Sequence, residues 1–480
     1  MVFSSIIFIF YFLPVFLIGY YVSGWRTGAL LVGSAAFYVW GEGGYVLLLL
    51  ALIGANHFGV RALDRAATAR RRGVLLAAII GLDLGVLVWF KYAGFLAHTI
   101  NGLVPGAPLP ELTHKLPLGI SFFTFQLISY AVDVWRRTTR AEPSLTRFAA
   151  YILMFSHLIA GPIVRYADIA AELQGNRKGS GRIGLGLQYF IVGLCQKVLI
   201  ANTVAPLADY AFGAPAGTLS ATGAWLGTLA YTLQIYFDFC GYSNMAIGLA
   251  FMLGFTFPRN FNYPYAATSL TDFWRRWHMS LSAWFRDYVY IPLGGNRGGR
   301  AATVRNLLIV FFLTGLWHGA AWSFVVWGLY HGAFLMLERF GLDRVLAAAP
   351  RMLRHVYALL VVMVGWVFFR AEDLPQALAY LAVMFDPRAF APLQIEALRL
   401  LDTEVIAAFV AGVVLAVPTL DTVLSRLKAP RSGAPSPHLP PHLDTRAAFV
   451  LPTPLLAVGF VVSIAVLVNS TLNPFLYFRF

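Results

Sequence analysis

Two histidines that lie among apolar and aromatic residues are the side chains best suited to chemistry in this chain. His318 lies in the run Thr-Gly-Leu-Trp-His-Gly-Ala-Ala-Trp, and His278 lies forty residues earlier in Asp-Phe-Trp-Arg-Arg-Trp-His-Met-Ser-Leu-Ser. An ionisable side chain at membrane depth is costly, and it tends to persist where it faces a bundle interior or a water-filled path. Both histidines are therefore candidates for functional residues, the alternative being structural histidines held by hydrogen bonds.

Imidazole suits general-base chemistry near neutral pH, because its ordinary pKa is about 6.5. Transfer of an acyl group from a thioester to a hydroxyl needs such a base, and burial favours the neutral ring that can accept a proton. The oxyanion that forms at the carbonyl needs hydrogen-bond donors. Trp317, Trp322 and Asn244 are candidates for that role. His331 would lie about 20 Å from His318 if one continuous helix joined them, so no direct role is predicted for it.

The composition places these residues in a membrane protein. The 480 residues are 59% hydrophobic and 12% charged, with a mean hydropathy of +0.69, whereas soluble domains carry about 25% charged residues. Many stretches approach or pass the roughly 20 apolar residues of a spanning helix. They are 2–22, 28–60 with a break at 42–44, 73–96, 116–135, 222–255, 306–328, 356–369, 405–427 and 449–468. We predict an all-α polytopic membrane protein with roughly 10–13 spans or half-spans.

The net charge of +14 does not indicate nucleic-acid binding, because Lys and Arg lie mainly in short loops between apolar runs. By the positive-inside rule, the basic loops 61–72 and 136–147 are predicted to be cytoplasmic and the loop 97–115 external, which places the N-terminus outside. The basic residues after 148–164 also look cytoplasmic. A single full span cannot have both of its ends in the cytoplasm. We therefore predict that this segment is a re-entrant hairpin that breaks at Gly161-Pro162.

The segment 231–244 is apolar enough to be buried, yet it carries Gln234, Asp238, Ser243 and Asn244. Buried polar groups need partners, because an unpaired one costs several kcal/mol in hydrocarbon. These residues either line a polar path or form interhelical hydrogen bonds. A further hypothesis is that Asp238 orients His318, as a carboxylate orients a catalytic imidazole elsewhere.

The block 273–290 interleaves basic and aromatic side chains. Such a pattern over Trp274–Arg286 suits a helix at the cytoplasmic interface. It would equally suit binding of a phosphate-bearing donor, with Arg275 and Arg276 as the candidate contacts. The Pro-rich stretch 429–446 is predicted to be a loop, and the two cysteines give no metal-ligand spacing, so no metal is predicted.

Several motifs resemble the membrane-bound O-acyltransferase superfamily, and more narrowly its bacterial alginate O-acetylase branch. They are Phe90-Lys-Tyr92, Leu116-Pro-Leu-Gly-Ile-Ser-Phe-Phe-Thr-Phe-Gln126, Ile159-Ala-Gly-Pro-Ile163, Gln234-Ile-Tyr-Phe-Asp-Phe239, Asn260-Phe-Asn-Tyr-Pro-Tyr265, Phe273-Trp-Arg-Arg-Trp-His-Met-Ser-Leu-Ser282, Tyr290-Ile-Pro-Leu-Gly-Gly-Asn296, Leu316-Trp-His-Gly319 and Pro474-Phe-Leu-Tyr-Phe-Arg-Phe480. The resemblance covers essentially the whole chain, which we treat as one membrane-embedded domain, 1–480, with its core motifs in 228–335.

The resemblance implies a helix bundle around a central tunnel, with His318 as the catalytic histidine near mid-membrane and His278 on the cytoplasmic side of the tunnel. It implies transfer of an acyl group, in the first place acetyl, from a cytoplasmic thioester donor to an acceptor on the outer face. The donor would be acetyl-CoA or an acyl carrier protein, and no bound cofactor is implied. A periplasmic partner with a serine hydrolase-like fold commonly completes transfer to a polysaccharide such as alginate. The implied location is the bacterial inner membrane.

Other functions stay open at this point. Within the enzyme class, the alternative is D-alanyl or other acyl transfer to teichoic acid, peptidoglycan or cellulose. A transporter or flippase could use His318 and Asp238 as a proton relay, but it predicts paired repeats with broken helices, and the sequence has no such repeat. A membrane scaffold gives no reason for a buried histidine beside Trp317 and Gly319.

Overall fold

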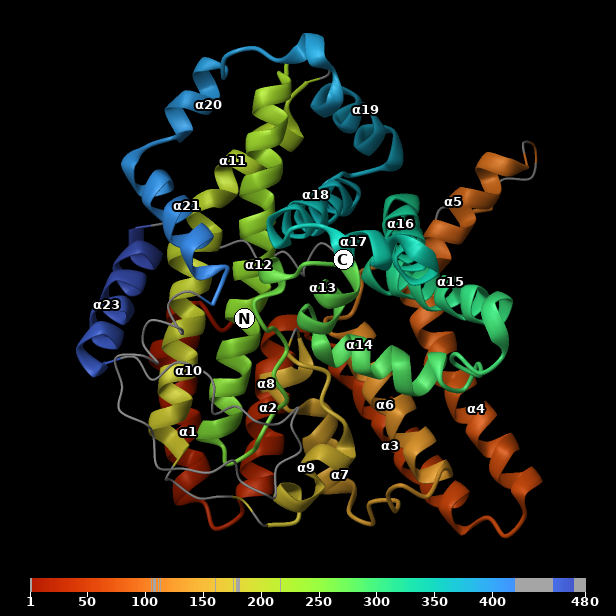
Figure 1. Ribbon diagram of the computed structural model, residues 1–480. Coiled ribbons are helices and arrows are strands. Elements are labelled where there is room, and N and C mark those ends of the chain that lie inside the picture. The colour runs from red at the N-terminus through yellow and green to blue at the C-terminus, as the bar shows by residue number, and fades with distance from the viewer. Residues whose placement is uncertain are drawn as a thin grey trace. The chain divides into compact units, whose positions relative to one another are not determined.

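The computed structural model describes residues 2–418, apart from 105, 107–108, 111, 113, 160, 176, 178–181 and 216, and residues 452–469. Within these residues the regular secondary structure is helical, and no strand is formed (Figure 1). The predicted all-α fold is therefore confirmed. The predicted loop 429–446 and the motif 474–480 lie outside the described residues.

The chain groups into two compact units, one made of residues 1–190 and 246–257 and the other of residues 191–245 and 258–480. His278 and His318 both belong to the second unit. The long helix α12 (Ala221–Met252) contributes to both units. That 1–480 forms one functional domain stays a prediction.

The first unit contains the N-terminal helices. They are η1 (Phe8–Phe12), α1 (Leu13–Val22), α2 (Arg26–Glu42), α3 (Tyr45–Arg65), α4 (Ala69–Leu87), η2 (Val88–Tyr92), α5 (Ala93–Leu103), α6 (Ile120–Trp135), α7 (Leu145–Leu153), α8 (Phe155–Leu158), α9 (Tyr166–Leu173) and most of α10 (Ile183–Cys195). The predicted break at 42–44 is confirmed: Gly43 has φ +58°, a conformation that glycine adopts without a steric penalty.

The segment 148–164 is broken, as its glycine and proline predict. α7 ends at Leu153, the four-residue α8 ends at Leu158, and residues 161–165 are not helical. Gly161 lies against the backbone of the preceding turn, since a Cβ there would be 2.9 Å from the Cα of His157. The membrane orientation of this segment stays a prediction.

The second unit contains the remaining helices. They are η4 (Gln196–Ala201), α11 (Asn202–Gly213), most of α12, η5 (Pro264–Ala266), α13 (Leu270–Arg276), α14 (Met279–Phe285), η6 (Arg286–Tyr290), α15 (Gly299–His318), α16 (Trp322–Leu337), η7 (Glu338–Leu342), α17 (Asp343–Ala348), α18 (Arg351–Arg370), α19 (Leu374–Phe385), η8 (Pro387–Ala389), α20 (Ile395–Leu400), α21 (Thr403–Leu415) and α23 (Thr453–Asn469).

The prediction of one continuous apolar span over 306–328 is wrong. α15 ends at His318, Gly319 and Ala321 are extended, and α16 begins at Trp322 and folds back against α15. Glycines permit this close return. A Cβ on Gly315 would lie 2.3 Å from the carbonyl oxygen of Phe324, and one on Gly328 would lie 2.2 Å from that of Phe311. Small residues allow helix backbones in membranes to approach in this way.

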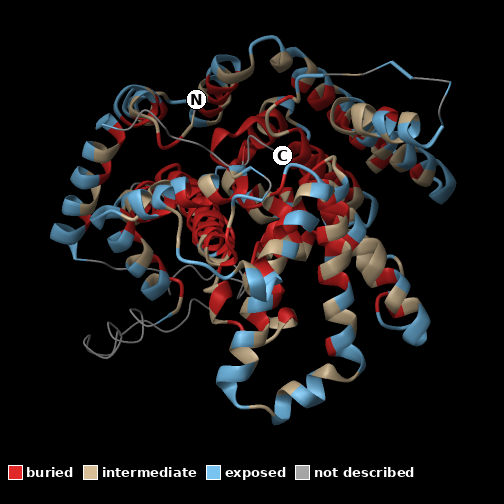
Figure 2. Ribbon diagram, turned by 90° about the horizontal axis from the view of Figure 1, so that it is seen from above, coloured by how far each residue is buried: buried red, intermediate tan, exposed pale blue. Residues whose placement is uncertain are grey.

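Five helical segments of the described chain are long and apolar enough to cross a membrane. They are Tyr45–Arg65, Ala69–Leu103, Ile183–Gly213, Gly299–His318 and Arg351–Arg370. Only 17% of the most apolar window of Ala69–Leu103 is buried, so this segment exposes an apolar surface that suits lipid. Many helices carry buried residues on one side and exposed residues on the other (Figure 2). The segment Ile183–Gly213 was not among the predicted spans.

Candidate active site

His318 is the last residue of α15 and is buried, with 3% of its surface exposed. Three aromatic side chains surround its ring. The centroid of Trp327, from α16, is 5.0 Å away, that of Phe369, from α18, is 5.2 Å away, and that of the neighbouring Trp317 is 4.9 Å away. The end of α15 therefore places the imidazole in an aromatic enclosure built by three helices.

His278 lies at a break between two short helices, so the prediction of one helix over Trp274–Arg286 is wrong. Its φ of +42° is left-handed, which is uncommon for a residue with a Cβ and often marks a functional site. The non-helical segment 258–262 supports the break. The Asn262 N–H donates to the carbonyl of Arg276, and the Met279 N–H donates to that of Asn260, both at 2.9 Å.

The break brings the two predicted histidines together. His278 is completely buried, and its ring centroid lies 6.5 Å from that of His318. Trp317 packs against both rings, with its centroid 5.8 Å from that of His278. Of the three candidate oxyanion donors, Trp317 is thus adjacent to both imidazoles, whereas Trp322 is half exposed at the start of α16.

His331 lies closer to this centre than a continuous helix would place it. Trp327 and His331 are four residues apart in α16 and therefore lie on one face of that helix, which folds back on α15. The Trp327 ring is 5.0 Å from that of His318 and 5.1 Å from that of His331. The separation of about 20 Å between His318 and His331 assumed that one continuous helix joins them, and no such helix is formed.

The polar residues of α12 face different neighbours. On one side, Asp238 forms an ion pair with Lys197 at 2.5 Å, and the Asn244 amide donates to Gln196 at 2.8 Å. On another side, Ser243 accepts a hydrogen bond from Asn260 at 3.0 Å. Gln234 is buried, and its Oε1 has no hydrogen-bond partner among the described residues. The interhelical hydrogen bonds considered above are therefore present for Asp238 and Asn244.

Two residues of this region were missed as site candidates. Lys197 is buried in the π-helical turn η4, and a single lysine inside an apolar run should have indicated a buried partner. Asn260 belongs to a quoted motif, but nothing in the sequence indicated its contact with His278. Its Oδ1 lies 3.1 Å from the Nδ1 of that ring. The partner found for Asp238 is Lys197, and its pairing with His318 stays a hypothesis.

Arg275 and Arg276, grouped by the sequence, have different surroundings. Arg276 pairs with Asp272 one turn earlier at 2.8 Å and also donates to the carbonyl of Asn262. Arg275 is exposed and lines a cavity of about 230 Å³, and no carboxylate among the described residues pairs with it. Arg275 is thus the arginine available to a ligand.

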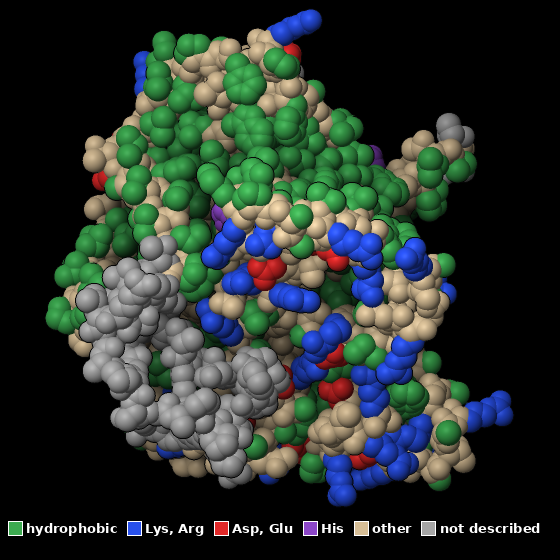
Figure 3. Space-filling model, in the orientation of Figure 1, with side chains coloured by type: hydrophobic (Ala, Val, Ile, Leu, Met, Phe, Trp, Pro, Cys, Tyr) green, Lys and Arg blue, Asp and Glu red, His purple; other side chains and the backbone are tan. Residues whose placement is uncertain are grey.

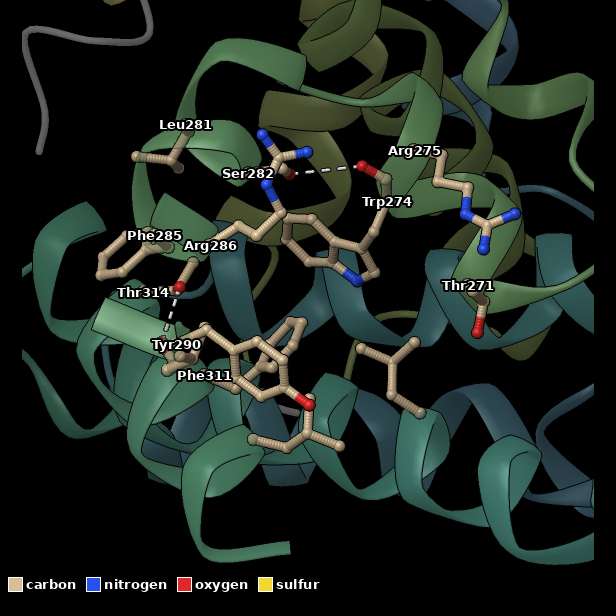
Figure 4. A pocket seen from close by; sticks show the side chains of 13 residues that line it. Thr271, Trp274, Arg275, Leu281, Ser282, Phe285, Arg286, Tyr290, Phe311 and Thr314 are labelled. Atoms are coloured by element: carbon tan, nitrogen blue, oxygen red, sulfur yellow. Dashed lines mark hydrogen bonds between the residues drawn. The ribbon is translucent and has the colours of Figure 1, made fainter. Parts of the chain in front are cut away.

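The cavity beside Arg275 is walled by the aromatic block and by α15. Figure 4 shows the Trp274 ring with Arg275 on one side and Arg286 on the other. The indole Nε1–H of Trp274 has no hydrogen-bond partner among the described residues. Phe311 and Thr314 of α15 complete the wall. The cavity therefore offers cationic and donor groups beside an apolar surface, while neither His278 nor His318 is among its lining residues.

A second cavity, of about 490 Å³, shares Thr271, Leu307 and Leu335 with the first. It adds two arginines and two acidic residues, which are Arg339, Arg354, Glu338 and Asp343. Lys and Arg side chains gather on the surface over α13–α17 (Figure 3). This part of the second unit thus presents a basic, hollowed surface.

Known proteins resemble the chain over its whole length. A sequence profile of the membrane-bound O-acyltransferase family matches residues 121–374. A probable alginate O-acetylase of Azotobacter vinelandii is 41% identical over the full length of both chains. A peptidoglycan O-acetyltransferase of Helicobacter pylori is 35% identical over 80% of each chain. A teichoic acid D-alanyltransferase of Bacillus subtilis is 28% identical over 52% of this chain and 68% of its own. The chain is an enzyme that belongs to the membrane-bound O-acyltransferase family.

Proposed function

We propose that the chain transfers acetyl groups from a cytoplasmic thioester across the membrane for O-acetylation of an extracytoplasmic polysaccharide, alginate in the first place. The observation that carries the proposal is the buried pair His278 and His318, with ring centroids 6.5 Å apart, in a chain 41% identical to an alginate O-acetylase over its full length. The second candidate acceptor is peptidoglycan, because a peptidoglycan O-acetyltransferase is 35% identical over most of the chain.

His318 is the proposed general base, and His278 is the proposed second histidine of the reaction. His318 takes the proton of the attacking hydroxyl, the oxygen attacks the thioester carbonyl, and the carbon–sulfur bond breaks. The leaving thiolate takes that proton back from the imidazolium and departs as the thiol. Trp317 packs against both rings, which supports it as the donor nearest the developing oxyanion. A base buried among aromatic side chains is shielded from water, so hydrolysis of the thioester competes less.

A path must lead to these histidines from both membrane faces if they lie at mid-depth. We place Gln234, Asp238, Ser243 and Asn244 along its wall, because α12 brings polar side chains into an otherwise apolar interior. The cavity beside Arg275 is the proposed entrance on the donor side, in the cytoplasm. Its arginines suit the phosphates of acetyl-CoA or of a carrier protein's prosthetic group.

The proposed setting is the bacterial inner membrane, with the N-terminus outside. The helices that expose apolar surface support the bilayer as the surrounding medium. The proposed partner on the outer side is a periplasmic protein with a serine hydrolase-like fold, which would pass the acetyl group to the polymer.

The test is complementation in an alginate-producing bacterium that lacks its own alginate O-acetylase. Expression of this chain should restore acetate that mild base releases from purified alginate. Acetyl groups on peptidoglycan and D-alanine on teichoic acid, measured in matched hosts, serve as the competing acceptors. Restoration in one of those hosts, with unacetylated alginate, would refute alginate as the acceptor.

Neutralising Arg275 should weaken use of the donor, whereas neutralising Arg276 should have little effect on it. Arg275→Gln is expected to lower acetylation about tenfold at limiting donor, since a hydrogen bond to a charged group contributes about 1.5–3 kcal/mol. Arg276→Gln removes a part-exposed ion pair with Asp272, which contributes about 0–1 kcal/mol, so the use of the donor and the yield of folded protein should stay close to wild type. Acetyl transfer per folded enzyme, measured against donor concentration, distinguishes the two variants.

Accessibility labelling of the loop after α14 provides the control for this comparison. If Arg275→Gln moves that loop to the other side of the membrane, Arg275 serves as a topological anchor and the donor assignment is wrong.

A further inference from the structure

The Asn260 side chain joins three parts of the second unit at a single buried point. Its Nδ2 donates to Ser243 of α12 at 3.0 Å. Its Oδ1 accepts from the Oγ of Ser280 at 2.9 Å and lies 3.3 Å from the Ser280 backbone nitrogen. The same Oδ1 lies 3.1 Å from Nδ1 of His278. Asn260 is 1% exposed, so water does not compete for these bonds.

These contacts decide which ring nitrogen of His278 carries a proton. A backbone N–H can only donate, so the Ser280 N–H requires an acceptor and thereby identifies the facing Asn260 atom as oxygen. An amide oxygen can only accept, so Nδ1 of His278 must carry a hydrogen to bond with it. In the neutral ring the other nitrogen, Nε2, then holds a lone pair.

We propose that Asn260 is a positioning residue, which holds His278 in the tautomer with Nδ1 protonated and presents its bare Nε2 to the acyl-transfer site. This inference rests on the proposed function. Nε2 of His278 has no hydrogen-bond partner among the described residues, although the ring is completely buried. A buried acceptor without a partner is costly, and such a group is one that a substrate or a reacting proton can satisfy.

The backbone supports the same role. His278 has the left-handed φ of +42°, and such a conformation persists only where its surroundings enforce it. The hydrogen bonds from Met279 and Ser280 to the carbonyl and side chain of Asn260 tie the two residues that follow the histidine to Asn260. Before the histidine, the carbonyl of Arg276 accepts from the Asn262 N–H.

The surroundings of His278 favour the neutral ring. His278 lies outside the five candidate spans, and burial lowers the pKa of its imidazole. Phe239 packs on it from α12 with a centroid distance of 4.7 Å, and Asn260 and Ser280 contact it from the flanking segments. None of these titrates near neutral pH. The titratable group that faces it is His318, from α15.

Asn260→Asp tests the proposal, because it keeps the shape and adds a negative charge. A carboxylate beside Nδ1–H favours the imidazolium, so it raises the pKa of His278, by about 1–3 units for a close opposite charge. Below the raised pKa, Nε2 carries a proton and no longer presents the lone pair that the proposal requires. The acidic limb of the pH–activity profile should therefore move to higher pH by one unit or more, with activity recovering in alkali.

The assay uses inverted membrane vesicles that contain the full-length enzyme, labelled acetyl-CoA and cytosol, so that carrier-protein thioesters can also form. Asn262→Asp is the matched control. It adds the same charge two residues away, at a position whose backbone bonds to Arg276, and its profile should coincide with that of the wild type. An Asn260→Asp profile that keeps the wild-type acidic limb overturns the proposal.

A double-mutant comparison separates positioning from a general loss of structure. If Asn260 acts through His278, Asn260→Asp should cause no further loss of activity in a His278→Ala background, because the two effects are not additive. A further tenfold loss in that background would refute the assignment. If the wild-type chain restores no acetylation in the complementation test, the proposed function fails. If His318→Ala is inactive while His278→Ala is fully active, only the inference about Asn260 fails.

Discussion

Cells that carry His318→Ala are expected to lose polymer acetylation while the protein still folds and inserts. The proposed role of the side chain is general-base catalysis, which typically raises the rate about 10²–10⁴-fold, together with positioning of the hydroxyl. It lies at the end of α15 within an enclosure of Trp317, Trp327 and Phe369. Base-released acetate per amount of membrane-inserted protein is the measurement.

His355→Ala is a suitable control for this variant. His355 lies on α18 and contacts the carbonyl of Ala267 through its Nδ1 at 3.1 Å, so it is a partly buried histidine with a structural hydrogen bond. It should retain acetylation close to wild type. Wild-type acetylation by well-expressed His318→Ala would refute the catalytic assignment and leave the histidine a structural role.

Lys197→Ala is expected to cause the largest loss of stability. Lys197 and Asp238 form an ion pair with side-chain exposures of 0% and 3%. Removing one partner of a buried pair leaves an uncompensated charge and costs about 3–5 kcal/mol. The variant should give a lower yield and a lower unfolding temperature in detergent, measured by the fraction that stays monodisperse after heating.

The double variant Lys197→Met with Asp238→Asn should recover much of that stability, because no charge is left buried. Lys115→Ala provides the exposed comparison. Lys115 pairs with Glu42 at 3.7 Å but is 66% exposed, and such pairs contribute about 0–1 kcal/mol. If the double variant is no more stable than Lys197→Ala, the ion pair is not the reason for the loss.

Loss of the ion pair between Lys197 and Asp238 should also disturb the packing around the two histidines. α12 holds Asp238 on the side that meets Lys197, and it holds Phe239 and Ser243 on the side that meets His278 and Asn260. A helix that shifts on one side cannot keep its contacts on the other, since packed interiors transmit strain. Any Lys197→Ala protein that still folds should therefore have reduced acetyl transfer.

The class of the fold and the identity of the candidate residues could be predicted from residue types and their order along the chain. Apolar runs predict helices wherever backbone groups must pair within their own segment, and the glycines at 42–44 and 161 marked real breaks. Histidine, aspartate and lysine in apolar surroundings must find partners or serve a function. That requirement identified His278, His318 and Asp238 before their neighbours were known.

The contacts between these residues depend on how the helices pack and could not be predicted from the sequence. The apolar residues 306–328 suit one helix, but α15 ends at His318. Gly315 and Gly328 permit α16 to pack back closely against it, because a Cβ on either residue would meet a backbone carbonyl. That return brings Trp327 against both His318 and His331.

The surroundings of the two neighbouring arginines and of Asn260 could not be predicted from the sequence either. Arg275 and Arg276 are alike as residues, yet one lines a cavity and the other pairs with Asp272. The contact between Asn260 and His278 joins residues eighteen positions apart through a left-handed turn. Hydrogen bonds of this kind depend on how segments pack in three dimensions, and local residue patterns do not predict that packing.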